Sequence, residues 1–215
     1  MTLALRTELG ATARRMSELG LTPGLSGNVS ARTERGFLVT PSGLAYDALG
    51  PDDLVAVDAD GTVRPGQLAP STEWQLHRDL YAARADASAI VHTHSLYCTT
   101  IACLRQPIPA IHYMVVLAGT DTIPCADYAT FGSPELAVHA VRALGAGRAC
   151  LLANHGLVAL GAALPAALRL AAEVETLASQ YWHASAIGRP VVLDAAELDR
   201  VRARFTGYGQ AKRRR

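Results

Sequence analysis

The sequence lacks any apolar run close to the ~20 residues that a membrane-spanning helix needs. Its first twenty residues include five charged side chains, which is not typical of a secretory signal peptide. Cysteine is scarce as well. There are four cysteines, and no two of them form a CxxC pair: Cys98, Cys103, Cys125 and Cys150. We therefore expect reduced thiols, no disulfide framework and a cytoplasmic protein without a membrane partner.

The sequence also lacks a strong excess of charge of either sign. Its net charge is +1, with 20 Lys and Arg against 19 Asp and Glu. The only basic run is KRRR at the end of the printed sequence, and without those four charges the rest carries −3. A mildly acidic body with a basic appendage gives no reason to expect nucleic acid as a partner. The sequence does not assign a role to the appendage.

Half of the 215 residues are hydrophobic, which suffices for one sizeable core. Because internal repeats and linker-like segments are absent, we expect a single domain over residues 1–215, with a flexible tail at 207–215. Helical spacing of apolar residues predicts helices at 2–19, 70–84, 95–105, 134–145, 164–188 and 195–205. Ser71 is the expected N-cap of the second helix and Ser133 that of the fourth.

Short apolar runs predict strands at 36–40, 54–63 and 87–94, the second folded back at Asp60 and Gly61. A buried strand pair is expected over 149–161, turning at the tripeptide NHG. Gly, Ser and Asn mark 22–33 as a loop, and Pro and Gly punctuate 109–119 and 122–132 into strands and loops. This order favours an α/β fold, with a sheet of mixed connections and helices on both faces.

The most informative short motif is His-Thr-His at the end of the strand expected over 87–94. On a strand, residues i and i+2 point to the same side, so His92 and His94 would share one space. A zinc site needs further donors, and His155 in the NHG turn and Glu73 near a helix start are candidates. Each of these residues also has an ordinary interpretation. His92 and His94 can be a solvated pair, His155 a histidine in a turn, and Glu73 a carboxylate that stabilises a helix N-terminus. Spacing alone leaves the choice open.

Seven segments, taken together in their order, resemble the class II aldolase/adducin-like family, most closely its L-fuculose-1-phosphate aldolases. The likeness runs from about Gly20 to Ile187, and the segments are GLSGNVSAR, VTPSGLAY, PSTEWQLH, VHTHSLYCTTIACL, IPAIHYM, IPCADYATFG and NHGLVALG. The resemblance implies a three-layer αβα fold around a mixed, mainly antiparallel sheet. It also implies a homotetramer with active sites between subunits.

The same resemblance implies one zinc ion per subunit, held by His92, His94 and His155, with Glu73 completing the set. The implied reaction is reversible cleavage of a ketose 1-phosphate, such as L-fuculose 1-phosphate, to dihydroxyacetone phosphate and an aldehyde such as lactaldehyde. Glu73 would also act as acid or base at carbon three of the substrate. Tyr113, reaching in from a neighbouring subunit, would move the proton of the hydroxyl on carbon four.

Three clusters of small and hydroxyl residues match the phosphate pocket of the family. They are Gly27 and Asn28, Ser42 and Gly43, and Ser71 and Thr72. Such residues let backbone N–H groups approach an anion, and a helix N-terminus favours its charge. Two further matches, Phe131 and Tyr208, imply contacts with the substrate aldehyde. The tail TGYGQAKRRR differs from the acidic ends of the fuculose enzymes, so the choice of aldehyde stays open.

Other reactions of the superfamily are alternatives. Epimerases of the family carry an aspartate close after the position of His112, and its dehydratases a glutamate at that of Tyr113, so both are disfavoured. A decarboxylase acting on another sugar phosphate is harder to distinguish. A non-catalytic adducin-like module is a different class of protein, and such relatives lose the zinc histidines, all of which stand in this sequence.

Overall fold

A seven-stranded sheet runs through the centre of the computed structural model, which describes residues 2–206. The strand order is β3-β2-β1-β4-β7-β6-β5, and every neighbouring pair is antiparallel except the parallel pair β5 and β6. The strands are β1 (Asn28–Arg32), β2 (Gly36–Val39), β3 (Val55–Asp58), β4 (Ala89–Thr93), β5 (Cys125–Ala126), β6 (Ala149–Leu152) and β7 (Gly156–Gly161). The prediction of a mixed, mainly antiparallel sheet is confirmed.

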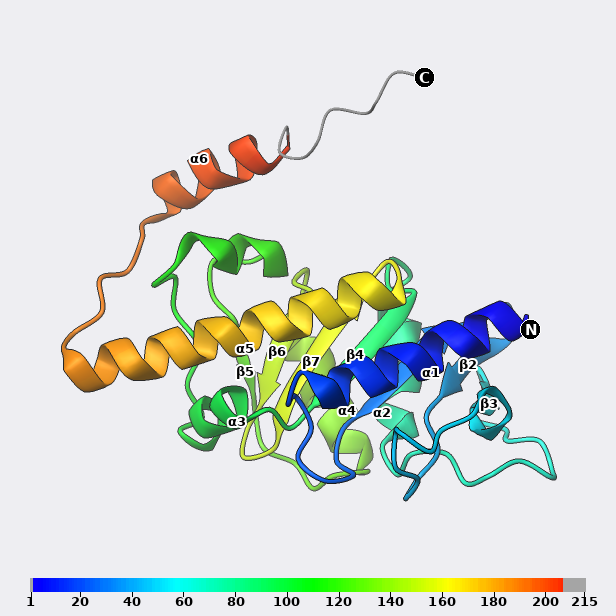
Figure 1. Cartoon of the computed structure of the whole chain (residues 1–215). Helices are drawn as coiled ribbons and strands as arrows, with labels where there is room; N and C mark the ends of the chain where they lie inside the picture. The colour runs from blue at the N-terminus through cyan, green and yellow to red at the C-terminus, as the bar shows by residue number, and fades with distance from the viewer. Residues whose placement is uncertain (1, 207–215) are drawn as a thin grey trace, which may run out of the picture.

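Helices cover both faces of this sheet (Figure 1). One face packs against α1 (Leu3–Glu18), α3 (Leu96–Cys103) and α5 (Leu164–Ile187), and the other against α2 (Trp74–Ala83) and α4 (Pro134–Leu144). Side chains alternate across a strand. Val91 of β4 therefore joins the core under α1 and α5, while its neighbour Ile90 joins the core under α2 and α4. The expected three-layer αβα fold is confirmed.

The remaining elements lie outside these layers or in the loops. They are the 3-10 helices η1 (Pro51–Asp53) and η2 (Tyr113–Ala118) and the helix α6 (Ala195–Phe205). Figure 1 shows α6 beyond the body of the molecule, next to η2. The Leu193 N–H donates to the Ala110 carbonyl at 2.9 Å, and Leu198 is buried, so α6 is attached through the segment around η2. Among residues 2–206, no helix combines the length and the apolar character needed to cross a membrane.

Residues 28–32 are not the expected loop but form β1, between β2 and β4 in the sheet. Val29 packs in the core on the side of α1, whereas Asn28 and Ser30 face the side of α2. Small polar residues suggested a loop because a buried strand seldom carries them. Here His77 of α2 provides the hydrogen bonds that make Asn28 and Ser30 tolerable inside a sheet.

The predicted N-cap at Ser71 is also wrong, because α2 begins at Trp74 with Glu73 as its N-cap. The Ser71 N–H donates to the Thr40 carbonyl at 3.1 Å, and residues 72 and 73 form a turn between Ser71 and the helix. Residues 109–119 contain η2 instead of strand, with only an isolated bridge between Ile108 and Ile123 beside it. The helix capped by Ser133 and the strand pair around NHG are confirmed.

Candidate metal centre and its cavity

The four predicted metal donors meet at the end of β4. His92 is the penultimate residue of that strand, His94 follows it, and Glu73 precedes α2. His155 lies in the turn between β6 and β7, and β7 is the neighbour of β4 in the sheet. Each side chain offers one donor atom, and the four atoms lie within 4.8 Å of one another. Three segments distant in sequence thus build one cluster.

The donor atoms face a common point. The two Nε2 atoms of His92 and His94 are 3.0 Å apart. Glu73 reaches the other imidazoles with one oxygen each: Oε2 lies 3.1 Å from Nε2 of His92, and Oε1 lies 3.1 Å from Nε2 of His155. The three imidazole rings form a triangle with centroid separations of 4.7 to 4.9 Å.

This cluster fits a bound cation. The Nδ1 of His92 lies 2.9 Å from the Leu157 carbonyl and donates its N–H there, so the lone pair of the neutral ring is on Nε2. That lone pair lies close to His94 Nε2 and Glu73 Oε2, so a proton or a metal cation among these atoms is needed to offset their repulsion. Glu73 Oε1 is buried and accepts no well-formed hydrogen bond from the described residues. Three imidazoles and one carboxylate are a donor set typical of zinc.

The protonation states suit metal binding. Burial raises the pKa of the Glu73 carboxyl, but the charge on His92 and the contact with His155 outweigh burial and hold this pKa well below its usual range. Burial, together with repulsion from His92 and His155, lowers the pKa of His94 to about 3. Burial opposes protonation of His92 too, but Glu73 raises the pKa of that ring. A metal ion would replace the proton on His92 as the partner of Glu73.

The turn at NHG holds His155 against β4. Asn154 adopts a left-handed backbone conformation with φ of 53°, and its side chain accepts a hydrogen bond from Arg105 at 2.8 Å. Only glycine fits at position 156, where the turn approaches β4, because a Cβ there would lie 2.1 Å from the Thr93 carbonyl oxygen. The same Cβ would lie 3.2 Å from the His94 ring. A glycine therefore lets the turn pack tightly enough for His155 to join the other donors.

A cavity of about 370 Å³ opens beside the cluster, and Glu73, His94 and His155 line it. All six residues predicted for a phosphate pocket line the same cavity: Gly27, Asn28, Ser42, Gly43, Ser71 and Thr72. They come from β1 and the loop before it, from the loop after β2 and from the loop before α2. No Lys or Arg is among the described residues that line the cavity, so an anion here would depend on N–H and O–H donors.

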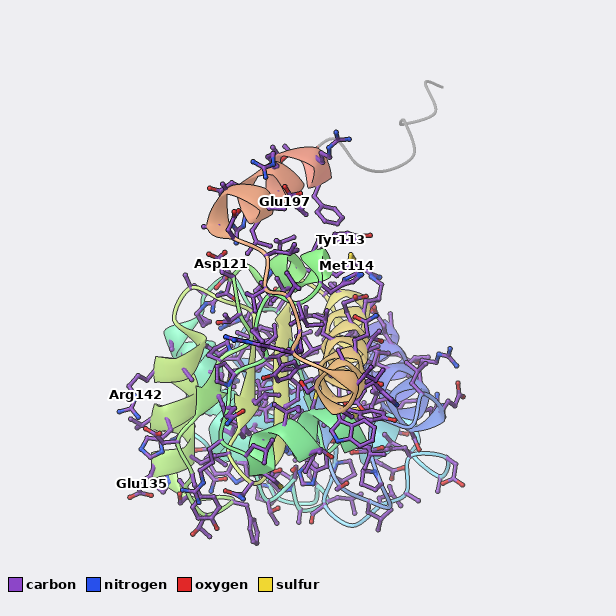
Figure 2. All side chains as sticks on the ribbon, turned by 90° about the vertical axis from the view of Figure 1, so that its left-hand side faces the viewer. Tyr113, Met114, Asp121, Glu135, Arg142 and Glu197 are labelled. Atoms are coloured by element: carbon purple, nitrogen blue, oxygen red, sulfur yellow. The ribbon has the colours of Figure 1, made fainter. Side chains whose placement is uncertain are left out.

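The three aromatic predictions have different outcomes. Phe131 lines the cavity and is 65% exposed. Tyr113 does not line it, and its ring stacks between His112 and Phe205 in a separate cavity under α6. Figure 2 shows Tyr113 and Glu135 at opposite ends of the molecule, and Glu135 follows Phe131 closely in the chain. Tyr208 lies outside the described residues.

Several lining residues were missed by the sequence analysis. These are Leu25, Ser26, Pro41, Tyr128, Ala129 and Asn154. Each of them lies within three positions of a predicted site residue in the sequence, and that proximity was the signal that could have found them. A second omission is the role of the Asn28 side chain, whose Nδ2 donates to Glu73 Oε2 at 3.1 Å. No short motif reports that contact, because 45 residues separate its partners.

Residues 7–182 match the model of a known family, described as the class II aldolase and adducin N-terminal domain. The chain belongs to this family. It is an enzyme of the class II aldolase type, a carbon–carbon lyase, and its aldolase relatives cover nearly its whole length. The interpretation as a non-catalytic adducin-like module is thereby set aside.

Two curated relatives and one solved structure show how similar this class II aldolase is to known enzymes. It is 48% identical over 207 residues to the 5-methylthioribulose-1-phosphate/5-deoxyribulose-1-phosphate aldolase of Rhodospirillum rubrum, covering 96% of this chain and 93% of the relative. It is 47% identical to an L-fuculose phosphate aldolase of Escherichia coli, covering 92% of each chain. A solved L-fuculose 1-phosphate aldolase superposes with a TM-score of 0.92 at 38% identity, covering 96% and 98% of the two chains.

Proposed function

We propose that this enzyme reversibly cleaves a ketose 1-phosphate to dihydroxyacetone phosphate and a short aldehyde, with a zinc ion held by Glu73, His92, His94 and His155. One observation carries the proposal: the residues of the anion pocket and the metal donors line a single cavity. A phosphate bound at one end would bring the adjacent carbonyl of the same substrate to the donors. The relatives compared above carry sugar-phosphate aldolase names, which supports this reaction class.

The phosphate would be held by neutral donors. Gly27 and Gly43 have positive φ of 79° and 72°, conformations that glycine adopts without strain and that let backbone approach a ligand closely. Ser42 and Thr72 offer hydroxyls to the cavity, and the N-terminus of α2 contributes favourable dipole potential. Because no described Lys or Arg lines the cavity, release of the phosphorylated product would not require a strong ion pair to break.

Glu73 is placed to exchange a proton with carbon three of the substrate. When bound, zinc supplies an electrophile that stabilises negative charge developing next to the ketone. Asn28 donates a hydrogen bond to Glu73 Oε2, whereas Oε1 accepts no well-formed hydrogen bond from the described residues, lies 3.1 Å from His155 Nε2 and belongs to a residue that lines the cavity. Oε1 is thus the atom that would take the proton in synthesis and return it in cleavage.

The aldehyde end of the cavity favours substrates with an apolar terminus. Tyr128 and Phe131 line this cavity, and both are at least half exposed, so their rings remain available to a ligand. They suit a methyl or methylthio group better than a hydroxymethyl group. We therefore place deoxypentulose, methylthiopentulose and L-fuculose 1-phosphates ahead of fully hydroxylated ketoses. This preference agrees with the names of the relatives.

The test is a panel of ketose 1-phosphates incubated with the zinc-loaded enzyme, with dihydroxyacetone phosphate and aldehyde measured as products. We expect both products in equal amounts, and a higher kcat/KM for deoxy and methylthio substrates than for hydroxymethyl substrates. The chelated enzyme is the matched blank. Carbon dioxide release without dihydroxyacetone phosphate would instead establish the decarboxylase alternative.

Tyr113 is proposed to serve the active site of a neighbouring copy within a homotetramer. In its own chain Tyr113 does not line the cavity with Glu73. Its ring is 46% exposed, and an exposed phenol beside an apolar cavity is suited to a subunit contact. There it would transfer the proton of the hydroxyl on carbon four.

Tyr113→Phe should lower kcat for cleavage by about 10²-fold or more, because the carbon-four hydroxyl loses its acid and base. Exchange of the carbon-three proton of dihydroxyacetone phosphate with deuterated solvent should persist, because that step needs Glu73 and not Tyr113. Cleavage by steady-state kinetics and exchange by NMR are the two measurements. Tyr97→Phe, on α3 and away from the cavity, is the matched control.

Mixing two inactive variants tests whether the site is shared. In tetramers co-assembled randomly from Tyr113→Phe and Glu73→Gln chains, roughly a quarter of the shared sites would hold both native residues. We expect that fraction of wild-type activity to return. No recovery in verified mixed tetramers would assign both residues to one chain or remove Tyr113 from the reaction.

A further inference from the structure

A chain of buried polar side chains leads from the Glu73 carboxylate into the layer between the sheet and α2. Asn28 joins Glu73 to His77, whose Nε2 contacts Asn28 Oδ1. On the other side of the ring, Nδ1 of His77 lies 2.6 Å from Ser30 Oγ, and that hydroxyl lies 2.8 Å from the Tyr81 hydroxyl. Each of the five residues is at most 5% exposed. Water cannot substitute readily for any member.

The hydrogen-bond directions along this chain are determined by its carboxylate end. An ionised carboxylate only accepts, so Asn28 must present its Nδ2–H to Glu73 and its Oδ1 to His77. His77 then donates from Nε2–H to Asn28. Its Nδ1 accepts from the Ser30 hydroxyl, which in turn accepts from the Tyr81 hydroxyl. One tautomer of His77 and one orientation of the Asn28 amide satisfy every group.

The His77 ring also stays neutral. Burial lowers the pKa of His77 to about 3, with the charge on His92 acting in the same direction and Glu73 opposing it. A neutral ring with a fixed tautomer has one donor and one acceptor, which is the pattern that Asn28 and Ser30 require. Within residues 2–206, no hydrogen bond joins His77 directly to a metal donor; the connection to Glu73 runs through Asn28.

We propose that His77 is a positioning residue for Glu73. By fixing the Asn28 amide, it anchors Oε2 of the carboxylate and thereby holds Oε1 beside His155 Nε2, in a residue that lines the cavity. Without the Nε2–H donor, the amide can turn over and present its oxygen to Glu73, which repels the carboxylate and displaces Oε1. This inference rests on the proton-transfer role proposed for Glu73 above.

The decisive pair of variants is His77→Leu and His77→Gln. Leucine fills the space without polar atoms, and we expect kcat to fall by about 10- to 100-fold while KM for the ketose 1-phosphate changes by less than about threefold. Glutamine carries a donor that can reach Asn28, and kcat should return to within about threefold of wild type. Kinetics are measured at saturating zinc, with bound metal quantified for each variant.

Tyr81→Phe is the matched control, because it removes a buried hydroxyl from the same chain but leaves the bond from His77 to Asn28. We expect a lower melting temperature but kcat within about threefold of wild type. If Tyr81→Phe and His77→Leu lose kcat in proportion to their loss of stability, the effect is structural and the proposal is overturned. If the wild-type enzyme yields no dihydroxyacetone phosphate, the proposed function fails, and the next measurement judges His77 separately.

A readout without turnover is the tautomer of His77 in the metal-free protein. Long-range ¹H–¹⁵N spectra, assigned by loss of signals in His77→Gln, should show a protonated Nε2 and a bare Nδ1 from about pH 5 to about pH 8. In His77→Leu, the side-chain amide signals of Asn28 should shift, whereas in His77→Gln they should stay near their wild-type positions. An Nδ1–H tautomer, or unchanged Asn28 signals in His77→Leu, would overturn the proposal.

Discussion

Glu73→Gln should lower kcat for cleavage by about 10²- to 10³-fold, because a carboxamide cannot take or return a proton. Deuterium exchange at carbon three of dihydroxyacetone phosphate should be lost to a similar extent. In this respect Glu73→Gln differs from Tyr113→Phe, in which exchange should survive. Glutamine keeps the size of the side chain, and three imidazoles still offer metal donors, so the variant should remain folded and bind zinc at a raised concentration.

The kinetics of Glu73→Gln are to be compared with those of Glu18→Gln. Glu18 is exposed on α1, where it pairs with Arg15, and it does not line the cavity. Its substitution should leave kcat and exchange unchanged. A Glu73→Gln enzyme that binds zinc and turns over at the wild-type rate would remove the carboxylate from proton transfer and from the proposed mechanism.

Removal of the metal should abolish cleavage, and zinc should restore it. Ligands that must converge without an ion repel one another, so the chelated protein should also melt at a lower temperature. A zinc concentration near 100 times its Kd would stabilise the fold by about 2.7 kcal/mol. Activity after exhaustive dialysis against a chelator, metal content by mass spectrometry and melting curves are the measurements. Cobalt, which accepts similar donors, should restore part of the activity and magnesium none.

Substitution of a donor separates metal loss from other effects of the chelator. His94→Asn should bind zinc much more weakly than wild type, with activity rising only at high zinc concentration. His183→Asn is the matched control, because His183 is exposed on α5, where its ring is hydrogen-bonded to Ser179, and it does not line the cavity. Equal zinc affinity in wild type and His94→Asn would contradict the assignment of the metal centre.

Some features of the candidate site could be predicted from local sequence because local geometry determines them. His92 and His94 share one side of a strand and its extension, since the period of a strand is two. Ser133 followed by Pro134 forms the start of α4 as predicted, because a hydroxyl cap and a first-turn proline act within a few residues. The convergence of His155 and Glu73 on that pair was suggested only through resemblance to a family.

Other features could not be predicted, because long-range contacts override local preference. The segment around Asn28 has the composition of a loop, yet it is a central strand because its polar groups find partners on α2. Ser71 has the chemistry of an N-cap, yet its N–H bonds to the Thr40 carbonyl and a turn follows it, so the helix starts only at Trp74. In both cases the deciding hydrogen bond joins residues about thirty or more positions apart.

The sequence alone determined the donor types, the small residues that a phosphate pocket needs and the alternation of apolar side chains that makes three layers. Tertiary structure alone decided that these groups lie around one cavity and that Tyr113 stands apart from it in its own chain. It also decided that Asn28 donates a hydrogen bond to Glu73 and is itself hydrogen-bonded to His77. The reason is physical: residue chemistry and strand or helix periodicity are local, whereas sheet order and the partners of buried polar groups depend on the whole chain.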